Sequence, residues 1–383
     1  MESYHPQATQ QEIDLGARSP EDHVRGSFRM LFLYDVGEAI DLAELKRLLG
    51  ARGDERRPRF RRGTPEHIRF EVPPYVERAE PVLLSTGQAA GCSLGYYSFA
   101  VIALQLELPF EGTWSDLVRE AVRWNGPTDL ETEMRAVVRE HVDRAKAALI
   151  RPHQEWLYET YLVVNVEQVF GSSGDPAPGH SLLTTRRKEI AQIVWGEDRA
   201  LSEGEIDEVC RASLSYYPGD LIVISSSGAF VYDRPDEAVA TTQVLEYAEM
   251  QLLELRYYDR VMSNVLTQLY DALEKNRSIF ARWTLSREAR RINRIRLDVA
   301  ELAERIDNDI KFVSDVYYAR VHRLAANRMG VAEYRDLVDE KLRTAGELYE
   351  FMVDEFNEAR SFVLEFAITI LALLDVIYLI RGH

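Results

Sequence analysis

The chain has 383 residues, of which 46% are hydrophobic, so it is long enough to form two or more units with cores of their own. Its formal charge of −17 argues against non-specific binding to nucleic acid or to an anionic membrane surface. Two cysteines, Cys92 and Cys210, are too few for a disulfide framework or a zinc cluster and favour a reducing compartment. Residues 1–27 are polar and lack the apolar core of a signal peptide, so we expect a disordered tail.

Residues 28–150 are expected to form a first small α+β unit that ends in a connector helix. Short runs of β-branched and aromatic residues predict strands, and apolar residues at helical spacing predict helices. Asp41 is placed to cap the first helix. The predicted strands are Phe28–Tyr34, His67–Val72, Glu80–Ser85 and Leu94–Leu108, and the predicted helices are Asp41–Leu49, Trp114–Trp124 and Glu131–Ile150.

Residues 151–235 are expected to form a second small α+β unit. Ser202 and Glu205 have the spacing of a capping box at the start of a helix. The turn at 225–228 lacks the Gly-x-Ser-x-Gly frame of a nucleophile elbow, so we interpret it as a hairpin turn. The predicted strands are Glu155–Phe170, Leu214–Tyr216, Asp220–Ser225 and Ala229–Tyr232, and the predicted helices are Ser181–Val194 and Ser202–Ala212.

Residues 236–361 are expected to form an antiparallel coiled-coil stalk of three long helices. Apolar residues alternate three and four apart, which keeps one stripe of each helix facing a partner helix. Gly330 is the predicted end of the second helix. The pattern leaves open whether the stripes pair within one chain or between chains. The three stripes are Leu255, Tyr258, Met262, Val265, Leu269 and Ala272, then Ile295, Val299, Leu302, Ile306, Ile310, Val313 and Tyr317, and then Val338, Leu342, Ala345 and Tyr349.

Residues 362–380 are expected to form a transmembrane helix, because a helix of this length can span a bilayer core of about 30 Å. The expected topology is tail-anchored in the inner (cytoplasmic) membrane, with the head in the cytoplasm. Two acids lie in this run, and a carboxylate near the middle of a bilayer costs on the order of 3 kcal/mol, so it needs a partner. The predicted contacts with the membrane or with other copies are Glu365, Phe366, Ile370, Leu373, Asp375 and Ile377.

A charged and aromatic cluster early in the first long helix is a candidate docking surface against the α+β units. It consists of Arg256, Tyr257, Tyr258 and Asp259. Such clusters also form solvated helix faces or pairs within one helix, and that alternative stays open. The eight histidines are scattered without metal-ligand spacing, so we predict no metal, no cofactor and no catalytic residue.

The C-terminal half resembles the family of required-for-meiotic-nuclear-division and Sad1-interacting-factor proteins, over about 155–383. The resemblance is carried by Leu364-Glu365-Phe366, an apolar run and Asp375, by the strands 220–224 and 229–232, and by Arg305-Ile306 near Asn308. Where that family has a tryptophan-bearing segment, this chain has 252–259. Mitochondrial members are membrane-anchored and support organellar translation. The resemblance implies a membrane-tethered scaffold without enzymatic activity.

The sequence therefore predicts a membrane-anchored, oligomeric scaffold or tether with a cytoplasmic binding head that is not an enzyme. Its partners would be further copies of the chain, a membrane and an unidentified protein, with no direct contact to nucleic acid. One alternative is a subunit of an oligomeric channel or transporter built around Asp375. A second alternative is an enzyme whose head binds a small molecule.

Overall fold

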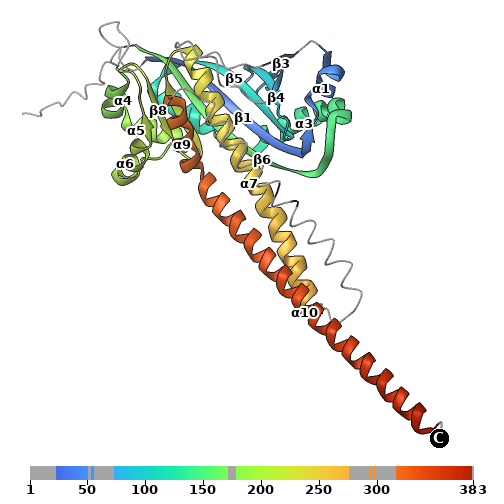
Figure 1. Cartoon of the computed structure of the whole chain (residues 1–383). Helices are drawn as coiled ribbons and strands as arrows, with labels where there is room; N and C mark the ends of the chain where they lie inside the picture. Colours follow the sequence, from blue (N-terminus) through green and yellow to red (C-terminus); the bar gives the residue numbers. More distant parts are fainter. Residues whose placement is uncertain are drawn as a thin grey trace, which may run out of the picture.

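A computed structural model describes residues 23–50, 53–55, 73–126, 128–170, 178–275 and 316–381, with the isolated positions 294 and 297. It shows a head built on a β-sheet, from which two long helices project side by side (Figure 1). The elements in chain order are β1 (His23–Ile40), α1 (Leu42–Leu49), β2 (Gly53–Glu55), β3 (Tyr75–Leu83), β4 (Ala89–Tyr96), β5 (Val101–Thr113), α2 (Trp114–Trp124), α3 (Thr128–Ala145), the 3₁₀ turn η3 (Lys146–Ala148), β6 (Leu149–Phe170), α4 (Gly179–Thr185), α5 (Arg187–Trp195), α6 (Glu203–Arg211), β7 (Ser213–Leu214), β8 (Leu221–Ile224), β9 (Gly228–Tyr232), α7 (Pro235–Lys275), α9 (Val316–Met329) and α10 (Val331–Arg381).

The head contains one mixed sheet, so the expectation of two separate α+β units is wrong. The described strands form a nine-stranded sheet in the order β2-β3-β4-β5-β1-β6-β9-β8-β7. The physical reason is the length of its two central strands, since β1 has 18 residues and β6 has 22. β6 pairs antiparallel with β1 along one edge and parallel with β9 along the other, which joins the two halves of the head.

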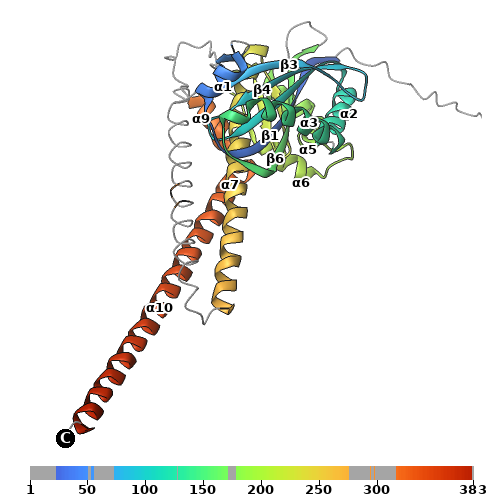
Figure 2. The ribbon, with the colours of Figure 1, turned by 90° about the vertical axis from the view of Figure 1, so that its right-hand side faces the viewer.

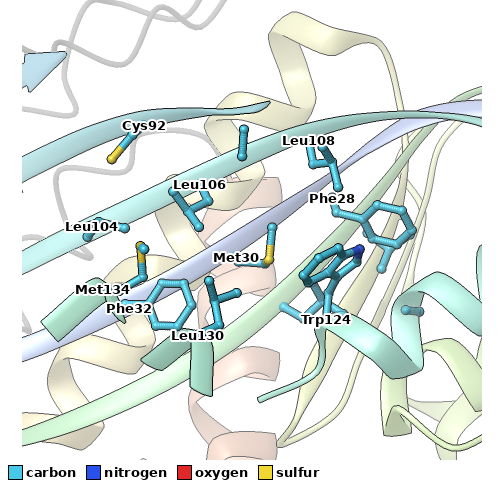
Figure 3. Packing of buried hydrophobic residues seen from close by; sticks show 14 of the residues in the cluster. Phe28, Met30, Phe32, Cys92, Leu104, Leu106, Leu108, Trp124, Leu130 and Met134 are labelled. Atoms are coloured by element: carbon cyan, nitrogen blue, oxygen red, sulfur yellow. The ribbon is translucent and has the colours of Figure 1, made fainter. Parts of the chain in front are cut away.

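The two faces of the sheet carry two apolar cores, because side chains alternate between the faces along each strand. Even-numbered residues of β1, such as Phe28, Met30 and Phe32, pack with α2, α3 and α5 (Figure 3). Odd-numbered residues, such as Leu31 and Leu33, pack with α7 and α9. Figure 2 shows the sheet between these two layers of helices.

Several predicted elements are confirmed with their caps. α2 has the predicted bounds, and the predicted hairpin is present as β8 and β9. The Asp41 side chain accepts hydrogen bonds from the backbone N–H groups of Ala43 and Glu44, and Ser202 accepts one from Glu205. Gly330, with φ of 83°, ends α9 as predicted. These caps and turns depend on residues that are close in sequence, so the sequence alone can predict them.

Other elements differ from the prediction in bounds or type. The apolar run expected as one strand, Leu94–Leu108, turns back on itself and contributes to β4 and β5. The predicted connector helix ends at Ala145, and Leu149 already begins β6. β1 starts at His23, inside the segment expected as a tail. The predicted strand His67–Val72 and most of the predicted second stalk helix (295–315) lie outside the described residues.

The stalk consists, in the described part of the chain, of the second half of α7 beside α10. The two helices run in the same direction, away from the head (Figures 1 and 2). Their apolar stripes pair within the chain and bury the side chains of Met262, Val265, Leu269, Val338, Leu342 and Ala345. α7 and α10 correspond to the first and third helices of the predicted stalk. In a stalk of three helices that alternate in direction, the first and third run parallel, as α7 and α10 do.

No described helix is long and apolar enough to cross a membrane, which overturns the predicted transmembrane helix at 362–380. The predicted tail-anchored topology and the predicted location at the inner membrane both depended on this helix, so neither is supported. The run is the end of α10, a continuous helix of 51 residues. Glu365 and Asp375 place two carboxylates within the run, and each charge is costly in a bilayer.

We expect Gly26→Ala to destabilise the protein, because β1 approaches β6 most closely there. A Cβ atom at Gly26 would lie 1.9 Å from the backbone oxygen of Asn165, at the bulge in the β1–β6 ladder. The backbone must shift, which should lower the free energy of unfolding by about 1–3 kcal/mol. Denaturant unfolding measures this change.

Gly91→Ala is the matched control, because the atom nearest to its added Cβ is 3.8 Å away. Its free energy of unfolding should stay within about 0.5 kcal/mol of wild type. Equal stability of the two variants would contradict the close approach at Gly26.

Candidate functional site

The first half of α7 crosses one face of the sheet and covers a layer of buried polar and charged side chains. We call this contact, between α7 residues 235–257 and the sheet, the α7 joint. On the sheet side, Arg29 and Asp35 of β1 are 3% and 2% exposed. On the helix side, Glu246 and Glu249 are each 2% exposed. Buried charges need partners, so their contacts define what the joint can do.

Arg29 lies beneath the first turns of α7. Its guanidinium donates to the Glu107 carboxylate from Nε at 3.2 Å and from Nη2 at 2.9 Å. It also donates from Nη1 to the hydroxyl of Thr242 on α7 at 3.4 Å. The Thr242 hydroxyl in turn donates to the backbone oxygen of Ala238 at 2.8 Å. This buried cation is therefore satisfied by the sheet and the helix together.

Further along α7, the carboxyl groups of Glu159 (β6) and Glu249 (α7) lie near the guanidinium of Arg256 (α7). Arg256 of α7 forms an ion pair with Glu159 of β6. Burial raises the pKa of the Glu159 carboxyl although Arg256 opposes the shift. Burial, with the nearby charge of Glu159, raises the pKa of Glu249 well above its usual range. Both carboxyl groups therefore keep a proton more readily than in water.

At the far end of the joint, Asp35 faces a histidine and a tyrosine. The Oδ1 of Asp35 lies 3.4 Å from Nε2 of His153, and the His153 ring stacks on Tyr257 of α7 with centroids 4.7 Å apart. Burial raises the pKa of Asp35, and His153 opposes that shift. Two non-glycine residues with positive φ in the described chain flank this part of β1: Ala100, in the turn just before β5, and Arg151, near the start of β6. Strained backbone often marks functional positions, because the surrounding structure has to hold it in place.

Buried polar atoms without a hydrogen-bond partner in the described structure gather on the α7 side of the sheet. They include both side-chain atoms of Asn165, and Asn165 is opposite Ser27 in the β1–β6 ladder. On the other face of the sheet, the corresponding atoms are the indole nitrogens of Trp114 and Trp195. On the α7 side they include Ser27 Oγ, Asp35 Oδ2, Gln105 Oε1, Asn165 Nδ2, Asn165 Oδ1 and Thr241 Oγ1. Each such atom destabilises the folded state by about 1–3 kcal/mol, so the α7 joint is held less firmly than an apolar joint of the same size.

The structure separates the predicted docking cluster into two places. Arg256 and Tyr257 contact the sheet as described above. Tyr258 packs at the boundary between the head core and the stalk core. Asp259 pairs with Lys341 of α10, which also donates to the hydroxyl of Ser263 at 2.8 Å.

The predicted contact residues near the end of α10 lie far from the α7 joint (Figure 1). Glu365 and Ile370 are exposed, and Ile370 is 45% exposed. The side chains of Phe366, Leu373, Asp375 and Ile377 lie outside the described ones. Their contact with other copies stays a prediction.

The sequence patterns did not single out Asp35, His153, Glu159 or Glu249. A usable signal was present, because Asp35 directly follows the apolar run that forms β1. An acid inside a run that becomes a central strand must be buried. Glu249 carried no such signal, since acids at helical spacing usually face water.

The arrangement can hold and exchange protons, and the described residues offer little other chemistry. They contain no group of three or more histidine, cysteine or acidic side chains that could hold a metal ion. Burial raises the pKa of the Cys92 thiol to about 11 and also raises that of Cys210, so neither thiol is activated as a nucleophile. Ser225 donates to the backbone oxygen of Val194 and shapes the predicted hairpin turn.

We expect Asn165→Leu to stabilise the protein by about 1–3 kcal/mol, because it replaces an unpartnered buried amide with an apolar group of similar size. Thermal or denaturant unfolding measures the change. Asn125→Leu is the matched control: the Asn125 amide donates to the backbone oxygen of Trp195 at 3.1 Å, so this change should cost about 0.5–1.5 kcal/mol. If Asn165→Leu destabilises the protein instead, a bound molecule satisfies the amide.

Comparison with known proteins places the head in a family. The family model described as "Uncharacterized protein MJ0711, N-terminal domain" matches residues 25–238, from β1 to the first turn of α7. The uncharacterized protein MJ0711 of Methanocaldococcus jannaschii is 20% identical over 235 residues, which are 61% of this chain and 70% of that protein. No solved structure matches. The match does not bear on the resemblance to the meiotic nuclear division family, which stays a hypothesis. Because the family model covers more than half of the chain, the chain belongs to the family of the MJ0711 N-terminal domain.

Proposed function

We propose that this protein is a non-enzymatic scaffold, in which the head binds a partner protein and the stalk joins copies of the chain. The observation that carries the proposal is the apolar stripe of α10, which continues beyond the described stalk core. The described part of α7 reaches Lys275, whereas α10 continues to Arg381 (Figure 1). Among the described side chains, the stalk core extends to Leu269 of α7 and Ala345 of α10.

Beyond that layer, α10 exposes large apolar side chains. Ile370, which belongs to the apolar stripe, is 45% exposed, Phe351 is 57% exposed and Leu371 is 63% exposed. An apolar surface of this extent usually marks a protein interface. The apolar stripe at heptad spacing continues from the buried pairs at 338–345 through 349 to 380. We therefore assign this surface to a second copy of α10, because it extends an interface that already exists in the stalk.

The second half of α7 fixes the distance between such an interface and the head. The same helix packs on the sheet and in the stalk, so the head is mounted on a continuous rod. A helix rises by about 1.5 Å per residue, so α10 is about 75 Å long. A head at one end of that rod, with a self-association site toward the other end, is suited to holding a bound partner away from the point of assembly.

We expect Ile370→Lys to weaken self-association at least about tenfold, because a charge at a buried heptad position costs more than about 1.4 kcal/mol. Sedimentation equilibrium of the full chain over a range of concentrations measures this change. Ile370 lies in the apolar stripe of α10 and its side chain is exposed in the single chain.

Ile368→Lys is the matched control, since Ile368 is also exposed but lies on the opposite side of the helix from the stripe. It should leave the association constant nearly unchanged. A wild-type protein that is monomeric at every concentration would contradict the proposal. Equal weakening by both variants would assign the association to non-specific apolar contact.

A further inference from the structure

The α7 joint holds more acid than base where α7 leaves the sheet. Glu249 is 2% exposed, and the side chain of Glu159 is 16% exposed. Arg256, whose side chain is 41% exposed, reaches in from the rim and pairs with Glu159. Within the described residues, it is the one cation whose charge acts on both carboxyl groups.

Among the described residues, the other groups around the pair add no second positive charge. Tyr161 of β6 lies below Glu249 and is buried, so its pKa is raised well above the usual range and it stays neutral. Tyr334 of α10 contributes its ring to Arg256, at 5.9 Å from the guanidinium carbon. From α9, His322 contacts Gln251, and burial lowers the pKa of His322 to about 4, so it is neutral near pH 7.

The remaining charges of the joint are engaged elsewhere. Arg29 is held by Glu107 and Thr242, and His153 lies beside Asp35. Glu246 accepts a hydrogen bond from the Tyr97 hydroxyl at 3.0 Å. Two carboxylates that share one guanidinium in a water-poor site cannot both be ionised at low cost.

We propose that the α7 joint is a proton-operated latch, in which a proton on the Glu159–Glu249 pair keeps α7 seated on the sheet. Loss of that proton leaves an uncompensated buried charge and loosens residues 235–257 from the head. The unpartnered polar atoms on this side of the sheet, such as those of Asn165 on β6 and Thr241 on α7, leave this joint little surplus stability. Because α7 continues into the stalk, loosening its first half changes how the head is mounted.

The sign of the pH dependence follows from linkage. The ordinary pKa of a glutamate is about 4.3, and the seated state has higher pKa values for both carboxyl groups. The seated state therefore holds a proton at pH values where the released state has lost it. Seating is strongest below about pH 4.3 and weakens as the pH rises through the raised pKa values.

Amide hydrogen exchange of the full chain, measured from pH 5 to pH 8 and corrected for intrinsic exchange rates, tests the latch. In the wild type, the protection of peptides within 235–257 should fall at least about tenfold over this range, which corresponds to one pKa unit of linkage. Glu249→Gln keeps the shape of the side chain and removes its titration, so its protection should change less than about twofold. Glu155→Gln, the same change at an exposed position of β6, should behave as wild type.

Two outcomes would overturn the latch: protection that does not depend on pH in the wild type, or a wild-type pH dependence that persists in Glu249→Gln. If Glu249→Gln fails to fold, Glu159→Gln takes its place. That variant removes one of the two titrating carboxyl groups and the negative charge that opposes ionisation of Glu249, so its pH dependence should be smaller than that of the wild type. None of these measurements depends on self-association, so the latch and the proposed scaffold can fail separately.

Discussion

The antiparallel pairing of β1 with β6 is the constraint on which the rest of the structure depends. Its register runs from His23 opposite Phe170 to Ile40 opposite Leu149. β5 pairs with the free edge of β1 and β9 with the free edge of β6, so both halves of the head are built outward from this pair. The pair also creates the surface on which α7 lies. The mixed sheet, the two cores and the position of the stalk all follow from two strands that are long enough to serve both halves.

That dependence explains what could be predicted from the sequence and what could not. Caps and short turns, such as those at Asp41, Ser202 and Gly330, are decided by residues within one helical turn and were predicted correctly. The single sheet was not predicted, because β6 pairs with a strand that begins more than one hundred residues earlier and with another that follows it by about sixty. Two local α+β patterns look the same in sequence whether they form two sheets or one. The cluster at Arg256 could be recognised in the sequence, whereas its partner on β6, Glu159, could not.

The buried acids of α7 show a second limit of periodicity. Glu246, Glu249 and Glu254 recur at helical spacing, which in an isolated amphipathic helix indicates a face in water. In this protein the same positions are 2%, 2% and 7% exposed, because α7 is enclosed by the sheet and by α9 and α10. The charge pattern therefore marks a buried polar layer. Polar contacts fix a geometry while adding little net stability. Such a layer therefore suits a helix that packs on the sheet in one defined position but can also come away from it.

The end of α10 was misinterpreted for a related physical reason. A membrane span and a helix that joins a bundle both present apolar residues over many turns, and they differ in how they treat charge. A carboxylate such as that of Glu365 or Asp375 is costly in a bilayer, whereas an acid on the flank of a bundle can reach water, and Glu365 is exposed. The same helix is tied to α7 by the ion pair between Lys341 and Asp259, two residues beyond Tyr257 at the end of the α7 joint. Any change in how α7 sits on the sheet is therefore passed directly to α10, so the head and the surface through which copies would associate are mechanically coupled.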